Sequence, residues 1–151
     1  MDKKRTKSFT EKFKYTARSI KTYCQISEAF VADVSNDRKP KFEKANALWD
    51  TGATSSCISN QLAEKLHINP IGFEEMYHAN GSSIVPTYLI NILLPNEIGF
   101  YHIHVLGCDL HNMDAIIGMD IISQGDFAIS NFEGKTFFSF RIQSTQNISF
   151  G

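Results

Sequence analysis

The chain has 151 residues and a net charge of −1, with 42% hydrophobic and 21% charged residues. These values are typical of one globular domain with its own core, and the near-neutral charge gives no reason to expect nucleic acid or an anionic membrane as a partner. No stretch approaches the roughly 18 consecutive apolar residues of a membrane span, and three scattered cysteines (Cys24, Cys57 and Cys108) exclude a disulfide framework and favour a reducing compartment, the cytoplasm.

The N-terminal segment is basic and has no apolar stretch after its charges, unlike a secretory signal. We interpret residues 1–20 as a flexible basic arm ahead of a domain that spans residues 21–151. An amphipathic targeting peptide is the alternative, which Asp2 and Glu11 weaken. The basic residues at the start of this arm are Lys3, Lys4, Arg5 and Lys7.

Most of the remaining chain has the pattern of short strands. Two β-rich segments at 23–35 and 45–50 are separated by turn formers and charge, and Asn80-Gly81 within 74–95 is the strongest hairpin signal. Leu62 and Leu66 have helical spacing, and either Ser59 or Asn60 is placed to cap, which predicts one helix of about two turns. Further strands are expected at 98–107, 115–122, 127–132 and 136–142. This pattern predicts an all-β barrel or sandwich with one short helix.

The end of the second β-rich segment, residues 45–50, contains the main functional signal. The apolar segment up to Trp49 runs into Asp50, which is followed by Thr51, Gly52, Ala53 and Thr54. A carboxylate at a buried strand end is costly unless something holds or uses it. Glycine permits a tight turn and the threonine hydroxyl can bond within it, so a turn whose carboxylate only caps the loop is the alternative interpretation.

The wider pattern resembles the retropepsin-like aspartic proteases, including the bacterial members. The Asp-Thr-Gly-Ala loop at Asp50 is followed by the hydrophobic-hydrophobic-Gly segment that ends at Gly118, with a Gly-tipped hairpin between them, and the resemblance covers roughly residues 23–142. It implies a retropepsin-like acid protease barrel with one short helix and an active site at a twofold dimer interface. It also implies an endopeptidase that needs no cofactor and cleaves extended polypeptide.

The chemistry of that family needs two aspartates. Two carboxylates roughly 4 Å apart repel by about 4 kcal/mol at an effective dielectric constant of 20, so one stays protonated and the other ionised, as is well known for aspartic proteases. No second Asp-Thr-Gly or Asp-Ser-Gly occurs in the chain. We therefore expect a homodimer in which each protomer supplies one Asp50. The other candidates lack the loop motif: Asp109, Asp114, Asp120 and Asp126.

The resemblance implies roles for the neighbours of Asp50. Gly118 and Asp120 support the loop, Thr51 bonds across the dimer axis, and Gly52 offers its carbonyl to a substrate backbone. Ala53 and Thr54 line the same region.

The hairpin tip resembles a flap that closes over substrate, with a plain solvent-exposed hairpin as the alternative. The flap residues are Asn80, Gly81, Ser82 and Ser83, and Ile84 and Ile116 are expected to line the cleft and favour apolar substrate residues.

Other features have simpler interpretations. Trp49 is expected to pack in the core beneath the loop, and Cys57 is expected to be a small buried residue, since no base adjoins it. His102 and His104 share a strand face, but no zinc signature accompanies them, so no metal is expected. The competing function is a non-catalytic dimerisation or peptide-binding module on the same fold.

Overall fold

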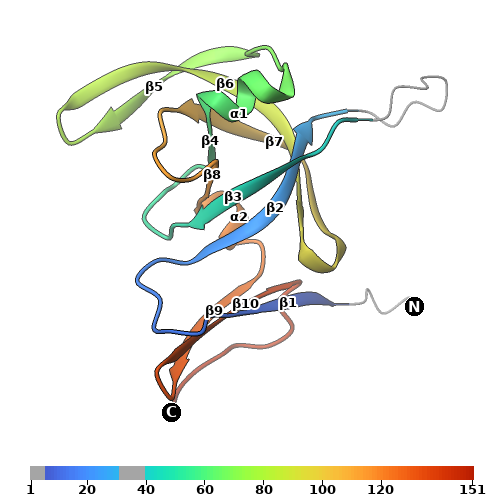
Figure 1. The fold of residues 1–151 in the computed structure, drawn as a ribbon, viewed down its shortest axis with the longest axis vertical. Helices are drawn as coiled ribbons and strands as arrows, with labels where there is room; N and C mark the ends of the chain where they lie inside the picture. The colour runs from blue at the N-terminus through green and yellow to red at the C-terminus, as the bar shows by residue number, and fades with distance from the viewer. Residues whose placement is uncertain (1–5, 31–39) are drawn as a thin grey trace.

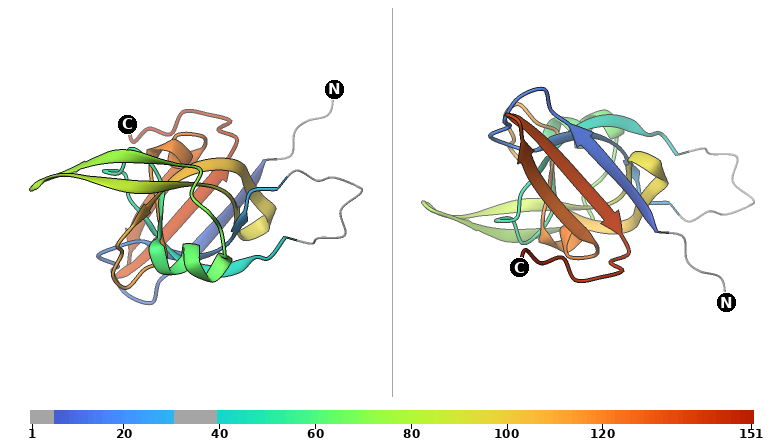
Figure 2. Two further views of the ribbon diagram at one scale, coloured as in Figure 1. Left: turned by 90° about the horizontal axis from the view of Figure 1, so that it is seen from above. Right: turned by 90° about the horizontal axis from the view of Figure 1, so that it is seen from below.

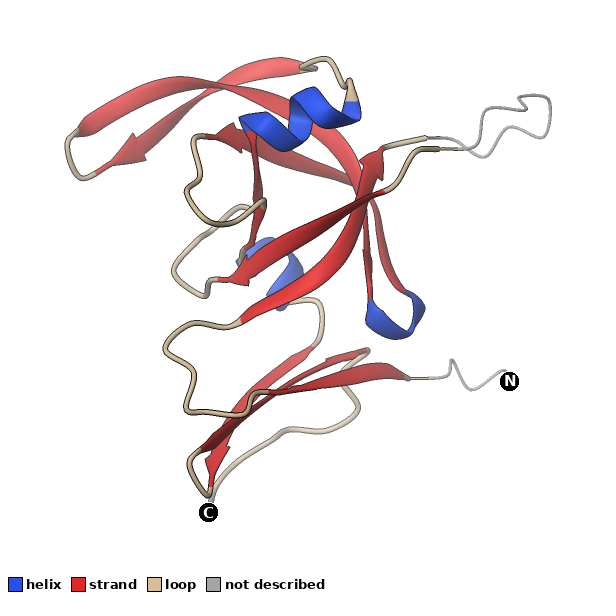
Figure 3. Cartoon of the chain, viewed as in Figure 1, coloured by secondary structure: helices blue, strands red, loops and turns tan. Residues whose placement is uncertain are grey.

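The computed structural model describes residues 6–30 and 40–151 (Figure 1). It is mostly β-structure with two short α-helices and one 3-10 turn (Figure 3). In chain order the elements are β1 Lys7–Lys12, β2 Lys21–Glu28, β3 Glu43–Trp49, β4 Cys57–Ser59, α1 Asn60–Leu66, β5 Gly72–His78, β6 Gly81–Leu94, η1 Pro95–Glu97, β7 Ile98–Cys108, β8 Ala115–Ile117, α2 Met119–Ile122, β9 Asp126–Phe132 and β10 Lys135–Ile142.

Six strands close into a barrel. They follow the order β2-β3-β8-β4-β7-β6, and β2 pairs again with β6, which completes the ring. β5 continues the sheet beyond the barrel by pairing only with β6, so the β5–β6 hairpin projects from one side of the molecule (Figures 1 and 2). The predicted all-β barrel is confirmed.

The predicted short helix is α1. The Ser59 hydroxyl accepts a hydrogen bond from the Leu62 N–H at 3.1 Å, and Leu62 and Leu66 are buried, as their four-residue spacing requires. The predicted hairpin at Asn80-Gly81 is also present, with His78 paired to Gly81 across the turn.

A second sheet of three antiparallel strands, β1-β10-β9, lies beside the barrel (Figure 2). The interpretation of residues 1–20 as a flexible arm is therefore wrong for residues 7–12, which form β1. Phe9 is paired with Phe140 and buried, while its neighbours Ser8 and Thr10 face outward. One inward aromatic in an otherwise polar strand gives little periodic signal, and the pairing partner lies at the other end of the chain. Residues 1–5 lie outside the described part.

An aromatic cluster joins this sheet to the barrel. The Trp49 ring centroid lies 4.8 Å from that of Phe138, 5.1 Å from that of Phe140 and 6.2 Å from that of Phe9. The Trp49 indole N–H donates to the Thr22 hydroxyl at 2.9 Å, which satisfies its one polar atom in the core. The predicted core role of Trp49 is confirmed, and the cluster anchors the end of β3 directly before Asp50.

Two segments differ from the sequence-based expectation. Residues 115–122 form a three-residue strand and then α2, because the N–H of Ile122 donates back to the carbonyl of Gly118 at 3.0 Å and bends the chain. The expected strand at 23–35 ends at Glu28, and residues 31–39 lie outside the described part. Among the described residues, none of the helices has the length and apolar character to cross a membrane.

Replacing Phe9 with alanine tests the role of β1. We expect Phe9→Ala to lower the free energy of unfolding by about 3–5 kcal/mol, because it removes a buried ring from the cluster. Phe132→Ala is the matched control: this ring is 65% exposed, so the change should stay within about 0.5 kcal/mol. Urea unfolding followed by the fluorescence of Trp49, the single tryptophan, measures both. Equally small effects would mean that residues 7–12 do not contribute to the core in solution.

Candidate active site

Asp50 lies where β3 leaves the barrel, and local hydrogen bonds hold it. Its own N–H donates to the carbonyl of Ile117 at 2.9 Å, so the strand end is tied to β8. The N–H of Gly52 donates to Asp50 Oδ1 at 2.8 Å, and the N–H of Ala53 donates to the Asp50 carbonyl at 3.2 Å. A Cβ at position 52 would lie 3.1 Å from Asp50 Oδ1, so glycine keeps the carboxylate uncrowded. The turn thus holds a half-buried carboxylate at its base.

The rest of the loop faces outward. Thr51, Gly52 and Thr54 are exposed and Ala53 is half-buried. The loop and the β5–β6 hairpin lie on the same side of the barrel, with the hairpin projecting above (Figure 1). The structure therefore places the predicted loop and flap residues on one side of the molecule.

Gly118 supports the loop from below by close backbone approach. A Cβ on Gly118 would lie 2.7 Å from the carbonyl oxygen of Ala53 and 3.0 Å from that of Ser55, which no side chain permits. The N–H of Met119 donates to the same Ala53 carbonyl at 2.8 Å. The turn between β8 and α2 is thus packed directly against the Asp50 loop.

Asp120 fixes the far end of the loop. Its Oδ2 accepts the N–H of Ser56 at 2.9 Å, while its Oδ1 accepts the Ser56 hydroxyl at 2.7 Å and the N–H of Ile121 at 3.0 Å. The Ser56 hydroxyl in turn accepts the N–H of Gly118 at 3.0 Å. Both carboxylate oxygens of Asp120 are occupied by internal donors, which fits a supporting role.

Ser56 was not predicted from the sequence. It is only 1% exposed, and its hydroxyl links Asp120 to Gly118. Its neighbours Thr54 and Ser55 are exposed residues of similar type, so residue identity alone gives no signal. Burial of a small hydroxyl two positions past the loop is visible only in three dimensions.

The hairpin tip is polar and exposed. Asn80 lies in the turn, and Gly81, Ser82, Ser83 and Ile84 begin β6, with Gly81 at φ +128°. The Ser82 hydroxyl donates to Glu75 Oε1 at 2.6 Å and the Tyr77 hydroxyl to Oε2 at 3.1 Å. These two bonds, the first above all, hold the pKa of Glu75 below its usual value. The Ser82 bond joins the two strands of the hairpin, and the Tyr77 bond lies within β5.

Strand register shows which side chains share the face beside Asp50. Leu48 pairs with Ile116, Ile116 with Cys57, and Cys57 with Leu106, so these four form one row on the outer face of the barrel. Leu48 is two residues before Asp50, so the row ends next to the loop. Leu48, Ile116 and Leu106 are each half-buried and offer an apolar surface.

Ile84 does not belong to this row. On β6 the residue that continues it is Thr87, the partner of Leu106, and Ile84 has the opposite parity. Its side chain is 69% exposed and shares the hairpin face with its partner Glu75. Ile116 therefore lies in the row beside the loop, whereas Ile84 lies on the exposed face of the hairpin.

The described residues contain no group of three or more His, Cys, Asp and Glu side chains placed to hold a metal ion. His104 Nε2 lies 3.6 Å from Glu74 Oε1 in an exposed pair, and His102 adopts a positive φ of 53°. His104 therefore makes a surface contact between β7 and β5.

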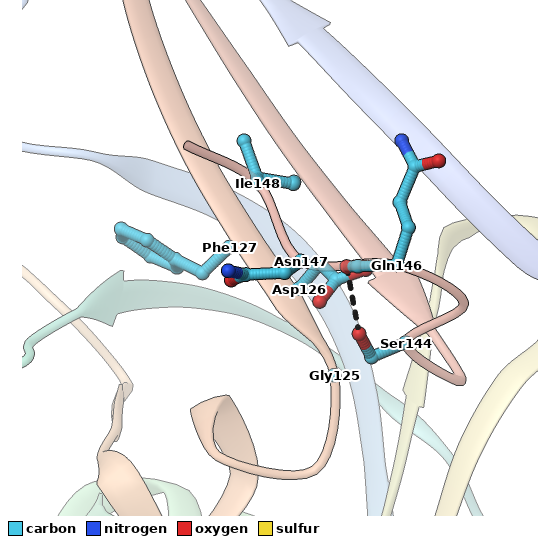
Figure 4. Close-up of a pocket in the computed structure, with 7 residues that line it drawn as sticks. All are labelled: Gly125, Asp126, Phe127, Ser144, Gln146, Asn147 and Ile148. Atoms are coloured by element: carbon cyan, nitrogen blue, oxygen red, sulfur yellow. Dashed lines mark hydrogen bonds between the residues drawn. The ribbon is translucent and has the colours of Figure 1, made fainter. Parts of the chain in front are cut away.

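A separate hollow of about 480 Å³ lies between β9 and the C-terminal segment (Figure 4). The Ser144 hydroxyl and the Arg141 guanidinium hold the pKa of Asp126 below its usual value, and Arg141 Nε donates to Asp126 Oδ2 at 2.8 Å. This carboxylate is already paired, which indicates a structural role for it. The hollow is lined by Gly125, Asp126, Phe127, Ser144, Gln146, Asn147 and Ile148.

Comparison with solved structures gives related folds. A retropepsin-like aspartic protease from Rickettsia conorii is similar at 15% identity, with 91% of this chain and 95% of that chain covered and a TM-score of 0.57. The simian foamy virus (mac) protease is 18% identical over 53% of this chain and 81% of that chain, with a TM-score of 0.41. No curated protein matched the chain.

A match to a protein-family model identifies the family of the chain. The model described as "gag-polyprotein putative aspartyl protease" matches residues 41–124, a range that contains the Asp50 loop, the β5–β6 hairpin, Gly118 and Asp120. The match covers more than half of the 151 residues. The chain therefore belongs to this family of retropepsin-like aspartic proteases.

Proposed function

We propose that the protein is an aspartic endopeptidase that works as a homodimer, with water activated between the Asp50 carboxylates of two protomers. The observation that carries this proposal is the rigid presentation of Asp50. The turn N–H of Gly52 orients the carboxylate, while Gly118 and the Asp120–Ser56 network fix both ends of the loop. Catalysis by orientation requires that the reacting carboxylate be held in a fixed position relative to the substrate.

The proposed reaction needs one ionised and one protonated carboxyl group. The ionised Asp50 takes a proton from water as the water oxygen bonds to the peptide carbonyl carbon, and the protonated Asp50 donates its proton to the carbonyl oxygen. Collapse of the tetrahedral intermediate then breaks the C–N bond, with a proton delivered to the leaving amine. Two facing carboxyl groups that share one proton supply both the general base and the general acid.

Substrate binding would use backbone pairing and apolar contact. An extended peptide held between the hairpin and the loop can hydrogen-bond to exposed backbone in the manner of an added strand. The half-buried row of Leu48, Ile116 and Leu106 beside the loop favours apolar side chains near the cleaved bond. We also propose a reducing location such as the cytoplasm, which the three free thiols support.

Asp50→Asn tests the catalytic role. We expect cleavage of denatured casein or a peptide library to fall by at least about a thousandfold, because asparagine can neither accept nor share the proton. Asp109→Asn is the matched control, since Asp109 is an exposed carboxylate outside the loop, and it should keep activity within about twofold. Equal activity of wild type and Asp50→Asn would leave a non-catalytic peptide-binding module as the function.

Mixing wild type with the Asp50→Asn variant tests whether two protomers share one site. After subunit exchange, a ninefold excess of the variant should lower the activity per wild-type chain to about one tenth, since nearly every wild-type protomer then has an inactive partner. An excess of bovine serum albumin at the same concentration controls for competition. Unchanged activity, together with a monomer by sedimentation, would contradict the dimer.

Asp120→Ala tests whether Asp120 supports the Asp50 loop or takes part in the reaction itself. We expect the free energy of unfolding to fall by about 1–3 kcal/mol, because the Ser56 N–H loses its acceptor. Displacement of the loop should also lower activity by about a hundredfold. Urea unfolding and casein cleavage measure the two effects, with Asp50→Asn as the variant that should change activity alone. Loss of activity at unchanged stability would give Asp120 a direct part in the reaction.

A further inference from the structure

The tip of the β5–β6 hairpin holds the one Asn-Gly pair in the sequence. Asn80 is the second residue of the two-residue turn that follows β5, and Gly81 is the first residue of β6. Both residues are exposed, and the hairpin carries them away from the barrel (Figure 1). A Cβ atom built on Gly81 would have no atom beyond its chain neighbours within 4 Å, so open space surrounds the pair on this side. The peptide bond between Asn80 and Gly81 is therefore open to water.

Asparagine is one of the chemically labile residues of proteins, and before a glycine it can close a ring with the backbone. The Gly81 nitrogen loses its proton to a base in solution and attacks Asn80 Cγ, which forms a new C–N bond. The bond from Cγ to Nδ2 then breaks, and the amide nitrogen takes up a proton and leaves as ammonia. The product is a five-membered succinimide ring made from the Asn80 side chain and the peptide bond to Gly81. No oxidant or reductant takes part.

The place of the pair in the hairpin favours ring closure. Residue 81 has no side chain, so nothing attached to it obstructs the approach of Cγ to its nitrogen. Gly81 has a φ of +128°, a conformation that other residues rarely adopt, so a larger residue is disfavoured here. His78 and Gly81 form the last pair of the β5–β6 ladder, so only this terminal pair has to open for the backbone to rotate. Terminal pairs open at a small free-energy cost.

Water opens the ring at either of its two carbonyl carbons. Attack at Cγ restores the original main chain and converts Asn80 to aspartate. Attack at the Asn80 backbone carbonyl carbon leaves Gly81 attached through Cγ, which is isoaspartate, and frees the backbone carboxylate. In both cases one water is consumed and one ammonia is released over the two steps. We propose that Asn80 is a site of spontaneous deamidation, and that its isoaspartate product alters the hairpin tip.

The two products differ in what they do to the hairpin. Aspartate keeps the length of the main chain and adds one negative charge. Isoaspartate also adds one carbon to the main chain of a turn whose length sets the strand register. We expect the pair His78–Gly81 to be lost and the 2.6 Å bond from the Ser82 hydroxyl to Glu75 Oε1 to weaken. A consequence for peptide cleavage rests on the proposed function, since this tip is the proposed flap, whereas the covalent change does not.

Incubation of the full wild-type chain in mildly alkaline buffer tests the proposal. Peptide mapping by mass spectrometry with electron-transfer fragmentation follows the conversion and separates isoaspartate from aspartate. The matched comparisons are Asn112 and Asn147, exposed asparagines that precede larger residues. We expect Asn80 to react at least about tenfold faster than either. Mildly acidic buffer should slow the reaction, because the Gly81 nitrogen must lose its proton. Equal rates at the three asparagines, or conversion of Asn80 without isoaspartate, would overturn the proposal.

Asn80→Gln is the matched control variant. Glutamine keeps the side-chain amide but would have to close a six-membered ring, so this variant should form no acid at position 80 over the same time. Amide exchange over residues 74–84 should quicken in the aged wild type, and it should stay unchanged in aged Asn80→Gln and in fresh Asn80→Asp. Unchanged exchange in the aged wild type would overturn the effect on the hairpin. Asp50→Asn should form the same isoaspartate, so the modification is measured independently of casein cleavage.

Discussion

The close contact between Gly118 and the Ala53 carbonyl is the constraint on which the site depends. It allows the β8–α2 turn to lie directly beneath the Asp50 loop, where Met119 and Asp120 donate their backbone N–H groups to loop carbonyls. The carboxylate of Asp120 then reaches Ser56, so one short segment fixes the loop at several points. A larger residue at position 118 would separate the two segments and remove all of these bonds together.

The aromatic cluster extends this constraint to the rest of the molecule. Trp49 immediately precedes Asp50, and its ring packs on Phe138 and Phe140 of the terminal sheet. The position of the catalytic candidate thus depends on packing between strands from the middle and the end of the chain. Rigid secondary structure beneath a loop is what lets a site hold its geometry more precisely than the loop could alone.

Much of this could be predicted from the sequence, because the informative signals are local. Alternating strands, the Asn80-Gly81 turn and the Asp50 motif each lie within a few residues. The inward role of Phe9 and the link from Ser56 to Asp120 could not be predicted, since each depends on a partner more than 60 residues away.

The pairing of β1 with β10 has a consequence for the order in which the chain can fold. Of the described strands, β1 is made first and its partner β10 last. Synthesis proceeds at roughly 5–20 residues per second, so for several seconds the growing chain holds Phe9 and Trp49 without the rings that cover them. Completion of the core, and with it a settled Asp50 loop, waits for β9 and β10 to leave the ribosome. A chain that lacks β10 therefore cannot complete the aromatic packing behind the Asp50 loop.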